Sequence, residues 1–473
     1  MTMKNINRIF KLSFFMGLVL SFTSCDDYLD INVDPNNPTE APISGLLVNT
    51  TLETAQNTFR LGDITSNYVQ QLASPNEAST SDIMENVSHG NTWFNLYNVM
   101  TDLQDLIIKS EELGASHYTG SAQIMTALNL GMTVDAFGSV PYSEAFDFET
   151  ITPAYDDDEV LYTEVIRLLN DGLFNLQEES TFLMGSDDFI YQGDVEKWIK
   201  FGNMLKARYL NHLSKTDAYD PTAILAAVEE GFESNDDDAQ IIYFSERFNP
   251  WAQVAINNEN LLLGGWISEH FIKALDGTTF DVFDPRLPLL VGETDDGEYI
   301  GVVNGAGRGD AAAAGARSTL TPEDFYSSPL SPLVIASYAE QKFIEAEAAF
   351  YVDNTRAYEA YLEGIRAHMR KVGVPSDEIQ EYINSPGVSV GAADLELADI
   401  FRQKFIALFL HPEAWVDARR FDYQYEGFTP PVNLNPDLDG ELIRRLGYPD
   451  SEISRNGRNV PDVSLTDPIF WDE

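Results

Sequence analysis

The chain has 473 residues, which is long enough to bury a large core, and it carries 76 acidic against 29 basic residues. The net charge of −47 argues against binding to nucleic acid or to an anionic lipid surface, because a surface of this sign repels phosphate groups. Cys25 is the only cysteine, so no internal disulfide can form and a zinc site built on several thiolates is excluded.

The first 24 residues have the layout of a secretory signal. A basic start is followed by the mostly apolar run 12–22, which is too short to span a bilayer. The segment Phe22-Thr23-Ser24-Cys25 resembles a bacterial lipobox, with Phe22 where leucine is usual. We therefore expect 1–24 to be a lipoprotein signal peptide and Cys25 to carry the lipids that hold the mature chain on a membrane. The alternative is an ordinary signal peptide followed by a buried cysteine.

Residues 25–42 are expected to start with the lipidated cysteine and to continue as an extended tether. Asp26 and Asp27 resemble the acidic signal that directs lipoproteins of the Bacteroidetes to the outer face of the outer membrane. The run 34–38 is rich in proline and asparagine, which disfavours regular structure. The prediction is an outer-membrane protein that contacts the membrane through its lipid anchor only and is exposed at the cell surface.

Amphipathic helices are predicted for the first half of the body. In 195–213, Trp198, Phe201, Leu205 and Tyr209 recur at spacings of three and four residues and form one apolar stripe. Similar stripes predict helices over 43–59, 93–107, 121–137 and 161–176.

The character of the sequence changes between about residues 234 and 331. Glycine and proline become more frequent, the helical period fades, and short strand-like runs occur at 241–245 and 299–303. Irregular segments on a rigid scaffold often carry binding residues. This loop-rich insertion is therefore the expected ligand-binding region.

The stretch 331–372 is predicted to be two helices joined by a turn at Asp353 and Asn354. The first helix has Pro332 in its first turn and small residues on its apolar face, and the second helix carries large apolar residues, which suits close antiparallel packing. Helix pairs of tetratricopeptide repeats pack in this way, although the strict repeat signature is absent. Two ordinary core helices are the alternative.

Helices are expected again over 395–410 and 415–421, followed by a long coil with a short helical piece at 441–446. No linker suggests separable domains. We therefore predict that 43–473 forms one compact, mainly α-helical body, in which tetratricopeptide-like helix pairs form a scaffold for the loop-rich region.

Five sequence blocks, taken together, resemble the SusD/RagB family of outer-membrane nutrient-binding lipoproteins, and specifically its SusD-like branch. The blocks are FGSVPYSEA (137–145), the segment 193–208 that begins with GDVEKW, the segment 338–348 that begins with YAEQKF, 405–420 with EAWVDARR at its end, and RRLGYP with Glu452 and Asn456. The resemblance implies an α-helical fold with tetratricopeptide-like pairs and no catalysis. It also implies a partner, a SusC-type TonB-dependent β-barrel transporter, to which the protein would pass its nutrient.

Oligosaccharide sites combine aromatic faces, which stack on sugar rings, with polar groups that reach the hydroxyls. Such residues occur at the start of the helix predicted at 93–107 and in the loop-rich region. The candidate ligand-binding residues are Trp93, Asn95, Tyr97, Trp251, Asn257 and Trp266. For Trp93 the alternative is a place in the core, whereas a turn at Asn249-Pro250 makes burial of Trp251 less expected. An oligosaccharide is the predicted ligand, and a peptide is the alternative.

Patterns for catalysis and metal binding are weak. The six histidines include no pair at metal-binding spacing, and the motif G-x-S-x-G is absent. Acidic runs such as 156–159 are expected to be solvated, with calcium as the less favoured alternative, so no cofactor is predicted. Arg419 and Arg420 are expected to pair with acids or to cap carbonyls. The protein is predicted not to be an enzyme, and a glycan hydrolase, which needs only two carboxylates, is the less favoured alternative.

Overall fold

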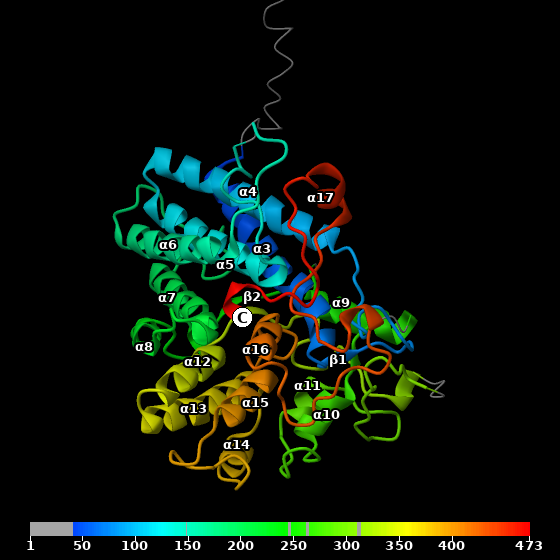
Figure 1. Cartoon of the computed structure of the whole chain (residues 1–473). Helices are drawn as coiled ribbons and strands as arrows, with labels where there is room; N and C mark the ends of the chain where they lie inside the picture. Colours follow the sequence, from blue (N-terminus) through cyan, green and yellow to red (C-terminus); the bar gives the residue numbers. More distant parts are fainter. Residues whose placement is uncertain (1–40, 148, 245–246, 262–263, 310–313) are drawn as a thin grey trace, which may run out of the picture.

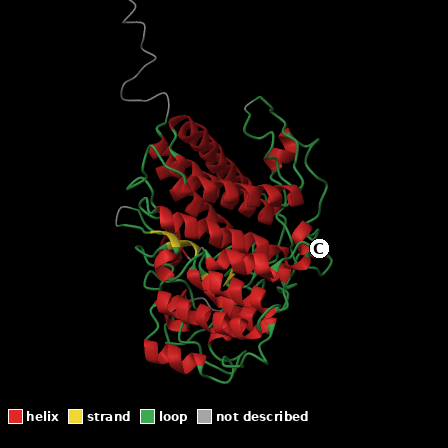
Figure 2. Cartoon of the chain, turned by 90° about the vertical axis from the view of Figure 1, so that its left-hand side faces the viewer, coloured by secondary structure: helices red, strands yellow, loops and turns green. Residues whose placement is uncertain are grey.

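The computed structural model describes residues 41–147, 149–244, 247–261, 264–309 and 314–473. The signal peptide, Cys25 and most of the tether predicted above therefore lie outside the described residues. Within the described ranges the chain is mainly helical, with two small two-stranded sheets (Figure 2). The prediction of one mainly α-helical body is confirmed.

Five long helices form the first half of the body, as the apolar stripes predict. They are α3 (Ile43–Tyr68), α4 (Gly90–Leu113), α5 (Ser116–Phe137), α6 (Asp158–Gln177) and α7 (Val195–His212). In Figure 1, α4, α5 and α6 are stacked at the upper end of the molecule. α5 lies inside this stack, because every residue from Tyr118 to Phe137 is buried.

Two facing glycines allow α5 and α6 to pack closely. A Cβ atom added at Gly120 would lie 2.7 Å from the carbonyl oxygen of Gly172, and one added at Gly172 would lie 2.9 Å from that of Gly120. Real Cβ atoms do not approach backbone oxygen so closely, so both positions require glycine for this helix spacing.

The lower end of the molecule is built on the helix pair α12 (Tyr338–Phe350) and α13 (Asn354–Val372), with α14 (Ser376–Ile383) and α15 (Leu397–Ala407) beside it (Figure 1). Asp353 caps α13 by accepting hydrogen bonds from two backbone amides, and Gly373 ends it in the left-handed conformation. Gly364 of α13 faces the ring of Phe343 in α12. The predicted tetratricopeptide-like pair is confirmed.

The predicted start of this pair is wrong. Residues Leu333–Ala336 form strand β4, which pairs antiparallel with β2 (Ala239–Ile241), and α12 begins after Ser337. Ser337 is the N-cap, because its hydroxyl accepts a hydrogen bond from the amide of Glu340 at 3.2 Å. A short apolar run fits a strand as well as a helix, and here the pairing partner decides between them.

The other elements are short. They are α8 (Pro221–Glu229), α9 (Pro250–Leu261), α10 (Glu269–Leu275), α11 (Leu287–Leu290), α16 (Glu413–Arg420), α17 (Asp450–Arg455), strands β1 (Leu72–Ala73) and β3 (Trp266–Ile267), and 3-10 turns η1 (Leu213–Lys215), η2 (Asn235–Asp237), η3 (Ala314–Ala316), η4 (Pro436–Leu438) and η5 (Phe470–Asp472). The predicted helical piece at 441–446 is wrong, since these residues are irregular and the next helix along the chain is α17. The run 299–303 contributes isolated bridges at Val302 and Val303 in place of a strand.

Buried ion pairs join the two ends of the body. Arg208 of α7 and Glu340 of α12 form a bidentate pair with both N–O distances at 2.7 Å, and Arg420 of α16 contacts Glu347 of α12 and Asp417. Arg419 donates hydrogen bonds to two backbone carbonyls. The structural role predicted for Arg419 and Arg420 is confirmed. Among the described residues, no helix is both long and apolar enough to cross a membrane.

Candidate ligand-binding site

Trp93 lies in an aromatic cluster and not on the surface. Its ring centroid is 4.9 Å from that of Tyr97, 5.0 Å from that of Phe137 and 6.2 Å from that of Tyr448, and the residue is 6% exposed. Tyr97 is held by a hydrogen bond of 2.6 Å from its hydroxyl to the carbonyl of Pro141, and burial raises its pKa well above the ordinary value. These neighbours cover the Trp93 ring, so a sugar has no free face to stack on in this conformation.

Asn95 lies on the same helix and is half-buried. Its side-chain nitrogen donates to the carbonyl of Asn91 at 2.7 Å, within α4. The nitrogen of the Asn95 carboxamide is therefore already hydrogen-bonded within α4.

Trp251 is buried in the first turn of α9, where it is 2% exposed and packs edge-on against Phe59 of α3 at 4.8 Å. The expectation that the Asn249-Pro250 turn leaves this ring uncovered is wrong. The side chain of Asn249 accepts a hydrogen bond from the Trp251 amide at 2.8 Å and donates to carbonyls of the 326–332 segment. The turn is thus a helix start fixed inside the protein.

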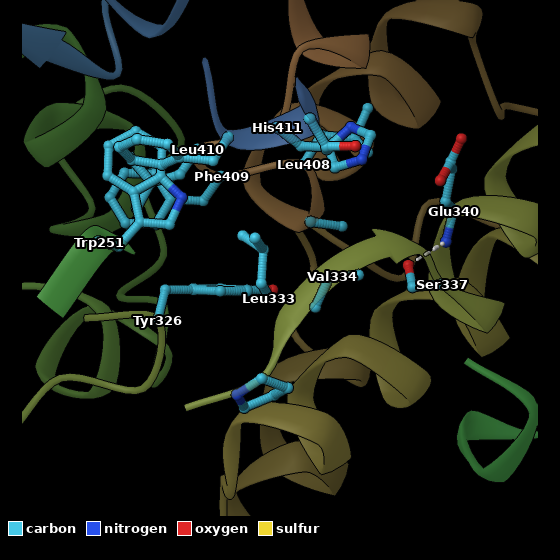
Figure 3. Close-up of a pocket in the computed structure, with 14 residues that line it drawn as sticks. Trp251, Tyr326, Leu333, Val334, Ser337, Glu340, Leu408, Phe409, Leu410 and His411 are labelled. Carbon is cyan, nitrogen blue, oxygen red and sulfur yellow. Dashed lines mark hydrogen bonds between the residues drawn. The ribbon is translucent and has the colours of Figure 1, made fainter. Parts of the chain in front are cut away.

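A small crevice lies beside Trp251, and Figure 3 shows Trp251 and Tyr326 on one side of it, with Ser337 and Glu340 on the other. Its volume is about 20 Å³. A cavity of this size holds roughly one water molecule. It cannot hold a sugar ring, so this part of the molecule is core.

Trp266 and Asn257 complete the predicted set. Trp266 in β3 is 0% exposed, and Asn257 of α9 is half-buried with its side-chain oxygen 2.9 Å from the side-chain nitrogen of Gln253. The six candidates therefore sit on α4, α9 and β3, and the three tryptophans are all buried. Their direct contact with a ligand stays a prediction, which requires the covered rings to become accessible.

A larger cavity, here called the acidic hollow, opens elsewhere. It has a volume of about 940 Å³ and lies between the start of α6, the chain from η1 to residue 218, and the segments around Arg445 and Phe470. This volume is within the range of roughly 300–1,000 Å³ that is usual for small-ligand sites. A second hollow of about 390 Å³ is lined by Tyr448, Asn86 and Val460 among others.

The start of α6 builds one wall of the acidic hollow. Asp157 is the N-cap, because its side chain accepts hydrogen bonds from the amides of Glu159 at 3.1 Å and Val160 at 3.4 Å. Asp158 accepts a hydrogen bond of 3.0 Å from the amide of Phe470, which attaches the opposite wall to the helix. The acidic run 156–159, interpreted from sequence as a solvated loop, is therefore a helix cap and a wall of a cavity.

The hollow has an apolar floor and an acidic rim. Ile166, Leu213 and Phe470 are half-buried and supply apolar surface. The acidic residues that line the hollow are Asp157, Asp158, Glu159, Asp217 and Glu473, and Arg445 is the basic residue among its lining. The field inside the hollow is therefore negative.

Tyr162 separates the hollow from a buried polar network. Its hydroxyl donates to Asp135 and lies 3.0 Å from Nδ1 of His212, whose Nε2 is 2.8 Å from Glu413. Burial raises the pKa of Tyr162 well above its ordinary value and also raises that of Asp135. Burial opposes ionisation of Glu413 too, but His212 and Arg208 hold the pKa of this carboxyl well below its usual range. The network fixes α5, α6, α7 and α16 behind the floor.

No group of three or more histidine, cysteine, aspartate or glutamate side chains within the described ranges is arranged to hold a metal ion. The acidic rim residues are thus spread around the opening and do not converge on one point.

Comparison with known proteins identifies the family. Residues 35–449 match the SusD-like family profile described as "Starch-binding associating with outer membrane". A comparison with curated proteins gave no match.

Solved structures share the fold. A SusD/RagB family protein from Bacteroides thetaiotaomicron superposes with a TM-score of 0.73 at 22% identity, covering 92% of this chain and 99% of that one. A SusD homologue from Bacteroides fragilis gives 0.75 at 21%, covering 91% and 100%. A chitin-binding SusD homologue from Flavobacterium johnsoniae gives 0.73 at 22%, covering 91% and 98%.

The family profile spans most of the chain and the solved relatives reproduce nearly all of the body, as the five sequence blocks predict. Members of this family are non-catalytic glycan-binding proteins that associate with the outer membrane. The chain therefore belongs to the SusD-like family.

Proposed function

We propose that this protein is a cell-surface lipoprotein that captures an oligosaccharide and passes it to a SusC-type TonB-dependent transporter in the outer membrane. The observation that carries the proposal is the family match over residues 35–449, whose description combines starch binding with the outer membrane. The chitin-binding relative from Flavobacterium johnsoniae supports a glycan as the ligand class.

The lipid anchor is part of the same proposal. Removal of residues 1–24 would leave Cys25 as the acylated first residue, and residues up to 42 would separate the body from the membrane. Stable residence on a membrane needs more than one acyl chain, which a bacterial lipoprotein cysteine supplies. The body has its own core, so Cys25→Ala should give a folded protein that is recovered in the soluble fraction. Recovery of this variant in the membrane fraction, or a wild-type chain that takes up no labelled acyl precursor, would contradict the anchor.

Ligand capture is tested with the purified body and a panel of starch, chitin and other oligosaccharides. We expect saturable binding without release of new reducing ends, because the family is non-catalytic. Saturable binding to a peptide, with no response to any oligosaccharide, would refute the glycan proposal. The transporter partner is tested by co-purification. A β-barrel transporter should co-purify with the whole protein and not with a chain from which the helical body has been removed.

A further inference from the structure

We infer that the acidic hollow binds an oligosaccharide that carries free amino groups. The inference rests on the proposed function, which supplies the glycan, and it adds the place and the charge of the ligand. Three features of the hollow support it: its floor, its rim and the unpaired Nη1 donor of Arg445.

The floor offers a fixed apolar surface. Phe470 is half-buried in the hollow, and its ring meets that of Tyr162 edge-on, with centroids 4.9 Å apart and an interplanar angle of 71°. The hydrogen bond from its amide to Asp158 fixes the backbone of Phe470. Ile166 and Leu213 extend this surface. A sugar ring has an apolar face that suits a surface of this kind.

The rim carries negative charge that the protein does not neutralise. Glu159, Asp217 and Glu473 are exposed, and the side chains of these three residues form no hydrogen bond or ion pair with any described residue. Asp157 and Asp158 use part of their carboxylates for backbone amides but keep their charge at the opening. Uronate or sulfate groups on a glycan would be repelled here, and ammonium groups would be attracted.

Arg445 supplies an independent observation. The residue is 5% exposed and lines the hollow, and Nη2 donates to the carbonyl of Phe137 and to the hydroxyl of Tyr448. Nη1 has no hydrogen-bond partner among the residues that the structure describes, and it is the donor left for a ligand because Nε is fully enclosed by protein. Unpaired donors of a buried guanidinium call for an acceptor oxygen. Sugar hydroxyls provide one, whereas a metal ion or a polyamine does not.

The position of the Arg445 guanidinium beside the chain at residue 138 depends on a glycine. Gly138 has a φ of +76°, and a Cβ atom added there would lie 2.5 Å from Nη2 of Arg445. Gly138 and Arg445 belong to two of the sequence blocks that resemble the family, 137–145 and 444–449. The donor is therefore placed by backbone geometry as well as by hydrogen bonds.

The test measures binding by calorimetry at about pH 6, where amines and carboxylates are both charged. The probes are a glucosamine hexamer with free amines, the same hexamer fully N-acetylated, and a uronate hexamer. We expect the glucosamine hexamer to bind about tenfold tighter than the acetylated one, and the uronate hexamer not to bind. Added salt should reduce the difference, because the rim is exposed to solvent.

Two double variants locate the effect. Asp217→Asn with Glu473→Gln removes two rim charges that have no partner in the described structure, so folding should be unaffected. It should weaken binding of the glucosamine hexamer about fivefold. Glu378→Gln with Glu381→Gln removes the same charge from the exposed face of α14, at the far end of the molecule in Figure 1, and should leave affinity unchanged.

The outcomes separate this inference from the proposed function. Binding of the glucosamine hexamer with an affinity that the rim variant does not change would overturn the hollow as the selective site and leave glycan capture standing. If Glu378→Gln with Glu381→Gln lowered the affinity for the glucosamine hexamer as much as the rim variant does, the preference would come from the overall charge of −47 and the inference would be overturned. Binding of a lysine-rich peptide in place of the glucosamine hexamer overturns the ligand class, and absence of binding to every oligosaccharide refutes both proposals.

Discussion

The buried pair between Arg208 and Glu340 gives the sharpest test of how the two ends of the body are joined. Arg208→Met keeps most of the apolar stem and removes the guanidinium, which contacts both carboxylate oxygens of Glu340 at 2.7 Å and the carbonyl of Ile335 at 3.1 Å. Both side chains are 2% exposed, so Glu340 would be left charged and without its main partner in the core. Glu340 would then destabilise the interface between α7 and α12.

The magnitude depends on the burial of the pair. Removing one partner of a buried ion pair costs about 3–5 kcal/mol. An unfolding entropy of about 2.1 cal/mol/K per residue gives about 0.9 kcal/mol/K for a body of roughly 420 residues. The expected fall in Tm is therefore about 3–6 °C, measured by differential scanning calorimetry.

Two further variants decide whether the unpaired carboxylate is the cause. Arg208→Met with Glu340→Leu removes both charges and should recover part of the lost stability, because an apolar replacement of a buried pair is often neutral. The recovery is partial because Glu413, 3.9 Å from Arg208, loses that ion pair and keeps the one with His212. Arg167→Met breaks ion pairs with Glu164 and Asp171 that are half exposed, and should change the free energy of unfolding by less than about 1 kcal/mol. A decrease in Tm of less than about 1 °C for Arg208→Met, or a double variant that is less stable than the single one, would refute the reasoning.

Three other predictions concern the core. Trp251→Ala should lower the free energy of unfolding by about 3–5 kcal/mol, because the ring is 2% exposed. This is measured by chemical denaturation, and an unchanged midpoint would show that the ring is not buried in solution. Burial raises the pKa of Asp324 to about 7, above the value of 3.8 for an exposed carboxyl, so this group makes the folded state less stable as pH rises from about 4 to 7. Asp324→Asn keeps an acceptor for the Thr321 amide, and it should be more stable than the wild type at about pH 8 but not at about pH 4. The same difference in unfolding free energy at both pH values would contradict the raised pKa of Asp324. Gly131→Ala would place a Cβ atom 2.3 Å from the ring of Tyr209 and should cost about 1–3 kcal/mol, so a variant with unchanged Tm would show that the ring moves freely.

Apolar periodicity predicted α3, α4, α6 and α7 because each of them buries one continuous stripe, whereas α5 is buried on every side. Trp198, Phe201 and Leu205 of α7 are 0% exposed, as the stripe requires. The run 333–336 could not be assigned in this way, since Leu333, Val334 and Ile335 suit a strand and a helix equally, and β2 lies more than ninety residues earlier. Pairing over such a separation leaves no local signal.

Side-chain burial at the candidate site was harder to predict. The Asn249-Pro250 pair predicted a turn where helix α9 begins, and it could not indicate that Asn249 hydrogen-bonds to the 326–332 segment and turns Trp251 inward. The acidic hollow left even less local signal, because its lining comes from separate segments between Ser139 and Glu473. The sequence blocks 137–145 and 444–449 were the available indication that these regions matter together.

The burial of α5 on every side makes this helix a natural reporter of global unfolding. Amide protons on helices at the periphery can exchange with solvent when one turn frays, but α5 is covered by α3, α4, α6 and α7 and meets water only when several of them detach. Its deuterium uptake should therefore track the free energy of the whole body. The slowest-exchanging amides of the protein can be sought between Tyr118 and Phe137, and they give a direct readout of variants anywhere in the chain.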